Sequence, residues 1–162
     1  MPTITDPMDG LTSFAPAFAA KKLEVEKCRL DPTIWVHLDS PQGTPRFTYV
    51  RARGHKVTAM VILVPVEPIE GVPCFGVGYA VPEDERGKGH ATELVTAAIA
   101  ELQAGFAVHG LTEFWVEAVV DQGNIPSQKV AAATLSSSPR PGTDSLSGTP
   151  IFVYARRYGA DI

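Results

Sequence analysis

The stretch VPEDERGKGHATELVTAAIAEL, residues 81–102, carries the strongest structural signals in the sequence. It follows an apolar run, opens with a charged loop, places two glycines between basic residues, and continues as a long alanine-rich segment. In that segment apolar residues recur three and four positions apart, which is the period of one helix face. The stretch therefore predicts a strand, a glycine-rich turn, and a helix that begins near residue 91 and ends before Gly110.

The turn at residues 86–91 has the chemistry of an anion-binding site. The first turn of a helix leaves backbone N–H groups without intrahelical partners, and their dipoles add up to a partial positive charge. Glycines let that backbone approach a bulky anion closely, and Arg86 and Lys88 add formal charge. A phosphate cradle is the functional interpretation, and a simple surface turn is the alternative. Three acidic residues just before the turn are interpreted as solvated loop charges: Glu83, Asp84 and Glu85.

Two familiar nucleotide-binding motifs do not fit this turn. A P-loop needs Ser or Thr after its glycine-lysine pair, whereas Gly89 follows Lys88, and it needs a glycine at position 82, where the chain has proline. A Rossmann fingerprint needs three spaced glycines at the start of a helix. Gly76 and Gly78 lack the third glycine and lie within the predicted strand.

The rest of the chain predicts an α/β (α+β) fold in a single domain, residues 1–162. Strand-like runs separated by short turns in the first half are typical of an antiparallel meander. We expect a central sheet of mixed, mostly antiparallel strands flanked by helices. Residues 1–13 are expected to be a loose lead-in, and residues 136–150 a flexible connection. The predicted elements are helices at 14–29, 91–109 and 127–135, and strands at 33–38, 46–53, 56–66, 75–81, 113–120 and 151–157.

Composition places the chain among ordinary globular proteins, because 44% of its residues are hydrophobic and 20% are charged. The formal net charge of -4 argues against general binding of nucleic acid or of an anionic membrane surface. Cys28 and Cys74 lack the spacing of a metal site or a disulfide framework, so no metal is expected. The N-terminus lacks the pattern of a signal peptide, and we expect a cytoplasmic protein.

Residues 86–91 match the signature Q/R-x-x-G-x-G/A, and through it the chain resembles the GNAT superfamily of acetyl-CoA-dependent N-acetyltransferases. In that family the signature follows the fourth strand and opens the next helix. A second match, residues 116–131, resembles the fifth strand and the following helix of the ribosomal-protein N-terminal acetyltransferase branch, with Asn124 and Ser127 at matching positions. The resemblance covers about residues 74–135 and the final strand. It implies a sheet that is splayed between strands 4 and 5.

The resemblance also implies acetyl-CoA as the cosubstrate. The signature would hold the pyrophosphate, and the pantetheine arm would lie between the splayed strands, beside Tyr79. A backbone N–H near Val81 would face the thioester oxygen, and Asn124 would hold the pantetheine amide or an ordered water. A helix N-cap is the alternative role of Asn124. The implied cofactor-binding residues are Tyr79, Val81, Arg86, Gly87, Lys88, Gly89, His90, Ala91 and Asn124.

Direct transfer to an amine needs a neutral amine, a stabilised oxyanion and a proton for the departing thiolate. Many family members supply that proton from a tyrosine, but counting from Asn124 its position is Ala131 in this chain. Ser127 is the nearest hydroxyl and becomes the candidate acid, with a capping or first-turn serine as its alternative role. Glu117, on the fifth predicted strand, is the candidate base, with an outward-facing solvated carboxylate as its alternative.

The sequence thus predicts an N-acetyltransferase that moves an acetyl group from acetyl-CoA to an amine. The acceptor is a peptide or protein α-amino group or a small amine. One alternative is a catalytically inactive CoA-binding sensor or interaction module, which the missing tyrosine favours. A second alternative is a different α/β domain whose turn binds a nucleotide. Strand edges that are expected to be exposed would allow a homodimer.

Overall fold

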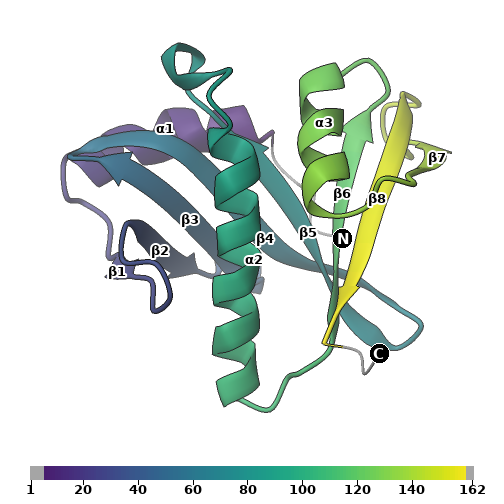
Figure 1. Cartoon of the computed structure of the whole chain (residues 1–162), viewed down its shortest axis with the longest axis horizontal. Coiled ribbons are helices and arrows are strands. Elements are labelled where there is room, and N and C mark those ends of the chain that lie inside the picture. The colour runs from purple at the N-terminus through teal and green to yellow at the C-terminus, as the bar shows by residue number, and fades with distance from the viewer. Residues whose placement is uncertain (1–5, 160–162) are drawn as a thin grey trace.

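The structure is a computed structural model that describes residues 6–159, organised around one eight-stranded sheet. The strand order is β1-β2-β3-β4-β5-β6-β8-β7, and neighbouring strands are antiparallel except for β5 and β6. Figure 1 shows α2 running across the middle of the sheet and α3 beside β6 and β8. The elements are α1 (Pro7–Ala19), β1 (Glu26–Lys27), β2 (Ile34–Asp39), β3 (Arg46–Arg53), β4 (Lys56–Ile69), β5 (Val72–Ala80), α2 (His90–Val108), β6 (Phe114–Asp121), α3 (Ile125–Thr134), β7 (Arg140–Thr143) and β8 (Pro150–Tyr158).

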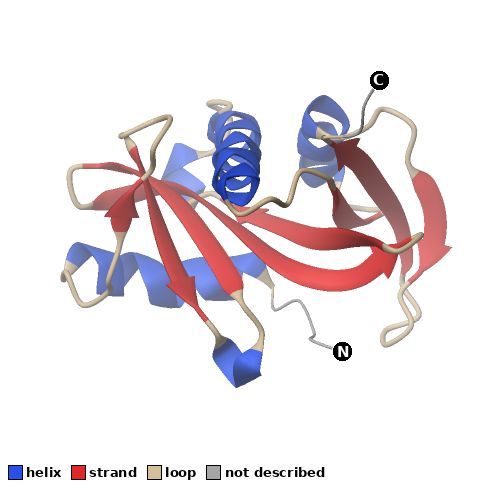
Figure 2. Ribbon diagram, turned by 90° about the horizontal axis from the view of Figure 1, so that it is seen from below, coloured by secondary structure: helices blue, strands red, loops and turns tan. Residues whose placement is uncertain are grey.

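Helices cover both faces of the sheet, and each face has its own core. Figure 2 shows α2 and α3 on one face and α1 on the other. On the first face, Leu94 of α2 is fully buried in a cluster that includes Val61 of β4. On the second face, Leu11 of α1 packs with Val50 and Met60. The two cores fix α1 and α2 on opposite sides of the central strands. The candidate site lies where β5 ends and α2 begins.

Helix α2 confirms the helix predicted after the glycine-rich turn. Its buried residues include Leu94, Ala98 and Leu102, which lie on the stripe that the sequence period indicated. Within residues 6–159, α2 is the one helix whose length and hydropathy would suffice to cross a membrane, a test that core helices also pass. The apolar stripe that packs against the sheet accounts for this composition. Gly110, with φ of 81°, follows the helix and allows the chain to turn.

The parallel strands β5 and β6 pair only briefly and then separate. Within the described residues, β5 continues to Ala80 and β6 to Asp121 without further pairing between them. The facing edges beyond the last pair therefore carry backbone groups that no strand satisfies. The predicted splay is confirmed, and it lies between β5 and β6 because the short strand β1 adds one to the count. The paired residues are Cys74 with Trp115, Phe75 with Val116, and Gly76 with Glu117.

The N-terminal helix differs from the prediction. Helix α1 begins at Pro7 and ends at Ala19, whereas the prediction placed a helix at residues 14–29 after a loose lead-in. The lead-in prediction is wrong for residues 7–13, which are helical. Residues 1–5 of that predicted segment lie outside the described part of the chain.

Local capping explains the early start of α1. The Asp6 carboxylate accepts a hydrogen bond from the Met8 N–H at 3.0 Å, and Pro7 occupies the first helical position. The apolar spacing used for the prediction begins about two turns later, at Phe14. The chain leaves the helix through Lys21, which has a positive φ of 58°.

The predicted flexible connection at residues 136–150 contains a strand, so that prediction is also wrong in part. Strand β7 pairs with β8 at the edge of the sheet. The Asp144 carboxylate then accepts hydrogen bonds from the N–H groups of Leu146 and Ser147 and closes the turn. All four β7 residues are exposed, so the strand has no apolar alternation by which a sequence pattern would reveal it.

Candidate active site

The N-terminus of α2 is an uncapped cluster of hydrogen-bond donors. Gly89 is the N-cap residue and offers no side chain, and the first helical hydrogen bond runs from the Glu93 N–H to the Gly89 carbonyl at 3.1 Å. Among the described residues, none accepts a hydrogen bond from the backbone N–H groups of residues 87–92. Together with the helix dipole, these free donors give the turn the chemistry that an anion-binding site requires.

The two glycines of this turn are required by the backbone. Gly87 and Gly89 both have φ of 78°, in the left-handed region that glycine adopts without strain. A Cβ atom at either position would meet nothing within 4 Å. The turn is therefore open to a ligand, and glycine is needed there for its φ rather than for lack of space.

Glu85 lies buried beneath the turn, which corrects its interpretation as a solvated loop charge. Its side chain is 1% exposed, and cationic groups contact both carboxylate oxygens. The hydrogen bond from Arg53, followed by those from Lys88 and Lys56, lowers the pKa of Glu85 to about 2 against the cost of burial. The contacts are Arg53 Nη2 at 2.5 Å and Lys56 Nζ at 3.4 Å to Oε1, and Lys88 Nζ at 3.2 Å and His90 Nε2 at 3.3 Å to Oε2.

Sequence reasoning missed Arg53 and Lys56 as neighbours of the turn. Both lie at the β3–β4 hairpin, far from the turn in sequence. The antiparallel register that pairs Met60 with Ala80 brings the start of β4 beside the end of β5, and with it these two cations. The sequence does predict the short hairpin that carries Arg53 and Lys56. Only the order of the strands in the sheet, however, shows that this hairpin lies beside the turn before α2.

Arg86 is directed toward the end of β5 and toward α1. Its Nε donates a hydrogen bond to the Val81 carbonyl at 3.1 Å, and its Nη2 lies 3.7 Å from the Met8 sulfur. In this arrangement the guanidinium supports the backbone at the mouth of the splay. The predicted contact between Arg86 and a pyrophosphate stays a prediction.

The side chain of Tyr79, on β5, reaches the first turn of α3. Its hydroxyl donates a hydrogen bond to the Ser127 carbonyl at 2.6 Å, and burial raises its pKa to about 12. The Ala131 position, where the family resemblance led us to look for a tyrosine, is fully buried. The phenol beside the start of α3 thus comes from a different element than the resemblance implied.

Asn124 has the N-cap contact that was its alternative role. Its Oδ1 accepts a hydrogen bond from the Ser127 N–H at 3.2 Å. The Asn124 amide nitrogen has no acceptor among residues 6–159, so it stays free to donate to a ligand. Ser127 lies in the first turn of α3, half-buried. The structure therefore brings Tyr79, Asn124 and Ser127 together at the start of α3.

Glu117 faces the side of the sheet opposite to α2. Its neighbours in β6, Val116 and Ala118, are buried in the core beneath α2, so the alternation of the strand turns Glu117 the other way. The side chain is half-buried rather than freely solvated. Burial raises its pKa, and the charge of Arg140 acts in the opposite direction. No ion pair or hydrogen bond within residues 6–159 occupies this carboxylate.

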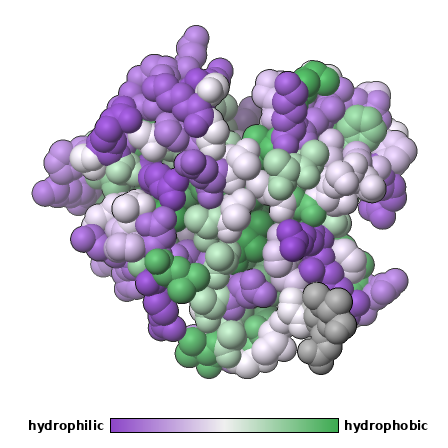
Figure 3. All heavy atoms as spheres, viewed as in Figure 1, coloured by the Kyte–Doolittle hydropathy of each residue, from purple (hydrophilic) through white to green (hydrophobic). Residues whose placement is uncertain are grey.

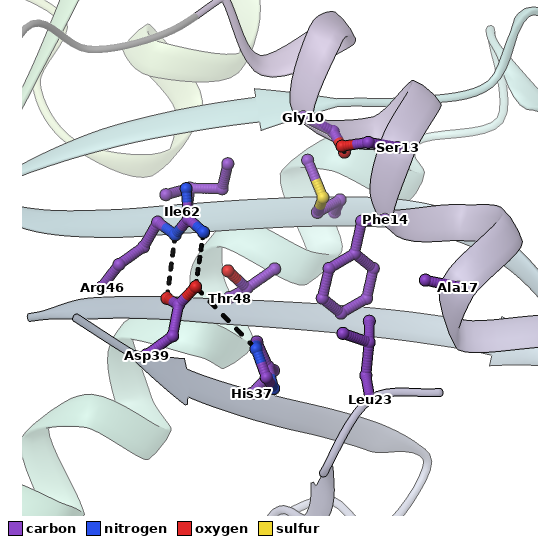
Figure 4. Close-up of a pocket in the computed structure, with 11 residues that line it drawn as sticks. Gly10, Ser13, Phe14, Ala17, Leu23, His37, Asp39, Arg46, Thr48 and Ile62 are labelled. Carbon is purple, nitrogen blue, oxygen red and sulfur yellow. Dashed lines mark hydrogen bonds and ion pairs between the residues drawn. The ribbon is translucent and has the colours of Figure 1, made fainter. Parts of the chain in front are cut away.

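A hollow of about 180 Å³ lies between α1 and strands β2 to β4. Figure 4 shows Arg46 and Asp39 joined there by two hydrogen bonds, with His37 on the far side of the carboxylate at 3.9 Å. Ile62 lines the hollow, and Val64, two residues on along β4, pairs with Gly76. Because Gly76 pairs with Glu117, the hollow and Glu117 open on the same face of the sheet.

The space-filling view shows how the turn before α2 and helix α3 lie relative to the split between β5 and β6. A notch separates the lobe formed by the turn before α2 from the lobe formed by α3, above the diverging ends of β5 and β6 (Figure 3). The uncapped end of α2 borders the first lobe, and the Tyr79–Ser127 contact joins β5 to the second. An anion held at α2 can therefore continue as an extended arm along the unpaired edge of β5.

Comparison with models of known protein families assigns the chain to a family independently of the site geometry. Residues 13–134 match the family model of the acetyltransferase (GNAT) domain, which is well over half of the chain. No curated protein matches the sequence.

Solved structures share the fold at low sequence identity. The ribosomal-protein-S5-alanine acetyltransferase from Vibrio fischeri gives a TM-score of 0.54 and 19% identity over 73% of this chain and 63% of its own. The chain therefore spans less than two thirds of that enzyme. An acetyltransferase of the GNAT family from Streptococcus pneumoniae gives 0.55 and 12% identity over 97% of this chain and 98% of its own. A ribosomal L7/L12 alpha-N-protein acetyltransferase gives 0.50 and 20% identity over 72% of both chains.

Proposed function

Since this chain belongs to the GNAT acetyltransferase family, we propose that it is an N-acetyltransferase that moves an acetyl group from acetyl-CoA to an amine. One observation carries the proposal. The uncapped N–H groups of residues 87–92 lie at the open end of the split between β5 and β6. A ligand with a pyrophosphate followed by an amide-containing arm matches both features.

The residues present fit acetyl-CoA as a bound cosubstrate. The N–H groups at the start of α2 would hold the pyrophosphate, with Lys88 adjacent. The pantetheine arm would lie along the unpaired edge of β5, past Tyr79 and Val81, in the way that an added strand does. The free amide nitrogen of Asn124 would donate to that arm. The arm and Tyr79 both need space in the split, so we expect the Tyr79 ring to line the arm.

Glu117 is proposed as the general base. The acceptor arrives as an ammonium ion and must lose a proton before its nitrogen can attack the thioester carbon. A half-buried carboxylate without an ion pair, and with a raised pKa, is a better proton acceptor than a solvated one. Glu117 receives the proton directly or through a water. The C–N bond then forms, the oxyanion is stabilised by a backbone N–H on the unpaired edge of β5 just beyond Gly76, and the C–S bond breaks as the oxyanion collapses.

The departing thiolate takes its proton near the start of α3. Ser127 is proposed to relay that proton: its hydroxyl gives a proton to the sulfur while its oxygen takes up the second proton that the amine nitrogen loses. Tyr79 fixes the position of Ser127 through its hydrogen bond to the Ser127 carbonyl. A thiolate is a fair leaving group unaided, so this proton contributes less to the rate than the base does.

The acceptor is proposed to be a peptide or protein α-amino group or a small amine, approaching on the face of Glu117. The hollow beneath α1 opens on this same face, and we propose that the far part of a larger acceptor is held there. The test is an assay with acetyl-CoA and a panel of N-terminal peptides, polyamines and amino acids. Free thiol would be followed by a colour reagent and the acetylated amine by mass spectrometry. Acetylation of any panel member supports the proposal.

The buried Ala131 favours a second candidate, a CoA-binding module without catalysis. The same assay separates the two. Tight binding of acetyl-CoA with no acetylated product from the whole panel would favour the binding module over the enzyme.

A further inference from the structure

Three exposed cations surround the buried Glu85, and we call Arg53, Lys56 and Lys88 the Glu85 cluster. Their side chains keep 66%, 44% and 54% of their surface exposed, whereas Glu85 keeps 1%. A buried carboxylate that stays ionised holds these cations at fixed positions while their outer surfaces face solvent. Hydrophilic residues gather on the lobe that the turn before α2 forms (Figure 3).

The Glu85 cluster has donors to spare. Arg53 uses one of its guanidinium nitrogens on Glu85, and the Lys88 ammonium has one carboxylate contact. Lys56 is the most committed of the three, because it contacts Asp84 as well as Glu85. Lys88 belongs both to this cluster and to the turn that carries the free N–H groups. The cluster and the uncapped helix end therefore form two adjoining anion sites of different kinds.

We propose that the Glu85 cluster, chiefly Arg53 and Lys88, binds the 3′-phosphate on the ribose of coenzyme A. This inference rests on the proposed function. Coenzyme A carries two anionic groups, a pyrophosphate and a 3′-phosphate. The neutral N–H groups at the start of α2 suit the pyrophosphate. The 3′-phosphate is a terminal dianion, so it needs side chains with formal positive charge. The planar donor set of an arginine matches a phosphate particularly well.

The other basic residues near the turn are occupied differently. Arg86 donates to the Val81 carbonyl and contacts α1. Arg51 lies between Asp31 and Glu93, in contact with both carboxylates. Among the described residues, the Glu85 cluster is thus the group of cations gathered at one place beside the turn, whereas Arg86 and Arg51 are each directed elsewhere.

The experiment compares coenzyme A with dephospho-coenzyme A, which lacks only the 3′-phosphate. Calorimetry would measure both ligands with the wild type, Arg53→Ala, Lys88→Ala and the charge-conserving Arg53→Lys. Arg157→Ala is the matched control, because Arg157 is a surface arginine of β8 that is paired with Glu113, just before β6. Thermal denaturation confirms that each variant is folded, and Arg53→Lys and Lys88→Ala keep the test valid where Arg53→Ala does not fold.

We expect the wild type and Arg157→Ala to bind coenzyme A roughly tenfold more tightly than dephospho-coenzyme A. In Arg53→Ala and Lys88→Ala this ratio falls toward one, and Arg53→Lys keeps part of it. Added salt reduces the ratio in the wild type. Equal binding of both ligands by the wild type overturns the inference and leaves the proposed function intact. An unchanged ratio in both alanine variants also overturns it. Failure to bind either ligand instead contradicts the proposed function.

Discussion

Gly76 of β5 and Glu117 of β6 form the last pair before the two strands part. The pair lies at the closed end of the split, and Glu117 faces away from α2 and α3. A ligand arm that enters between the strands from the α2 end would therefore end near this carboxylate. An acceptor would reach the same point from the opposite face. This relationship links the fold to the chemistry we propose, because it places a base where the two substrates meet.

Glu117→Gln tests the base. We expect kcat to fall by roughly 10²–10⁴-fold with the best amine acceptor, because the amide cannot accept the ammonium proton. The affinity for acetyl-CoA should stay within about twofold of the wild type. A variant that retains full turnover would contradict the assignment.

The pH profile gives a second readout of Glu117. The base must be ionised, so activity is lost as the pH falls through its pKa. Burial raises that pKa above the ordinary glutamate value of about 4.3. We expect the acidic limb of kcat against pH in the wild type to lie above this value and to disappear in Glu117→Gln. If the acidic limb lay at the same pH in both proteins, it would belong to a group other than Glu117.

Gly89→Ala tests the turn at the start of α2. Its φ of 78° is unfavourable for alanine, so we expect a loss of about 1–2 kcal/mol in the free energy of unfolding. Relaxation of this strain would move the N–H groups, and acetyl-CoA should bind roughly tenfold more weakly. Gly105→Ala is the matched control inside the same helix, where an added Cβ meets nothing within 4 Å. That control should gain about 0.5–1 kcal/mol and bind acetyl-CoA normally.

Tyr79→Phe tests the link between β5 and α3. Loss of the hydroxyl removes the hydrogen bond to the Ser127 carbonyl, so we expect the free energy of unfolding to fall by about 1 kcal/mol in urea denaturation at neutral pH. Burial raises the Tyr79 pKa to about 12, so its share of stability is present below about pH 10 and is lost as the pH rises toward 12. The difference between wild type and variant should narrow over that range. Equal stability of the two proteins at neutral pH would show that the contact does not hold α3.

Glu85→Gln tests the ion cluster beneath the turn. The folded-state pKa of about 2 lies below the ordinary value, so the stability from ionised Glu85 is present above about pH 4.5 and is lost as the pH falls through 2. The variant should therefore melt at a lower temperature than the wild type at neutral pH, and the two melting temperatures should converge in acid. Glu83→Gln, at an exposed neighbouring position, is the matched control and should melt like the wild type at neutral pH. Parallel curves for Glu85→Gln and the wild type would exclude the ion cluster as a source of stability.

Much of the fold could be predicted because its signals are local. The period of α2, the turn glycines and the alternation of β3 and β6 each depend on near neighbours in the sequence, and each prediction is confirmed in its main bounds. The errors lie where a local signal was absent or overlooked. The N-cap Asp6 fixes the start of α1, and the edge strand β7 has no buried face to leave a pattern.

The site was predicted less completely because its contacts cross between elements. Burial of Glu85 depends on Arg53 and Lys56, which the strand register delivers from another hairpin. The hydrogen bond from Tyr79 to the start of α3 depends on how far β5 and β6 diverge. Neither contact can be predicted from the spacing of the residues in the sequence. The roles of Arg86, Asn124 and Ser127 toward a ligand stay predictions.

Calorimetric titration of the purified chain with acetyl-CoA tests whether the turn before α2 and the split between β5 and β6 bind this cosubstrate. We expect one site per chain with a Kd in the micromolar range, roughly -8 kcal/mol, that coenzyme A competes for and ATP does not. Absence of any heat of binding at millimolar acetyl-CoA, with a protein shown to be folded by its cooperative melting, would contradict the claim. The free N–H groups of residues 87–92 would then belong to a surface turn with no ligand of this class.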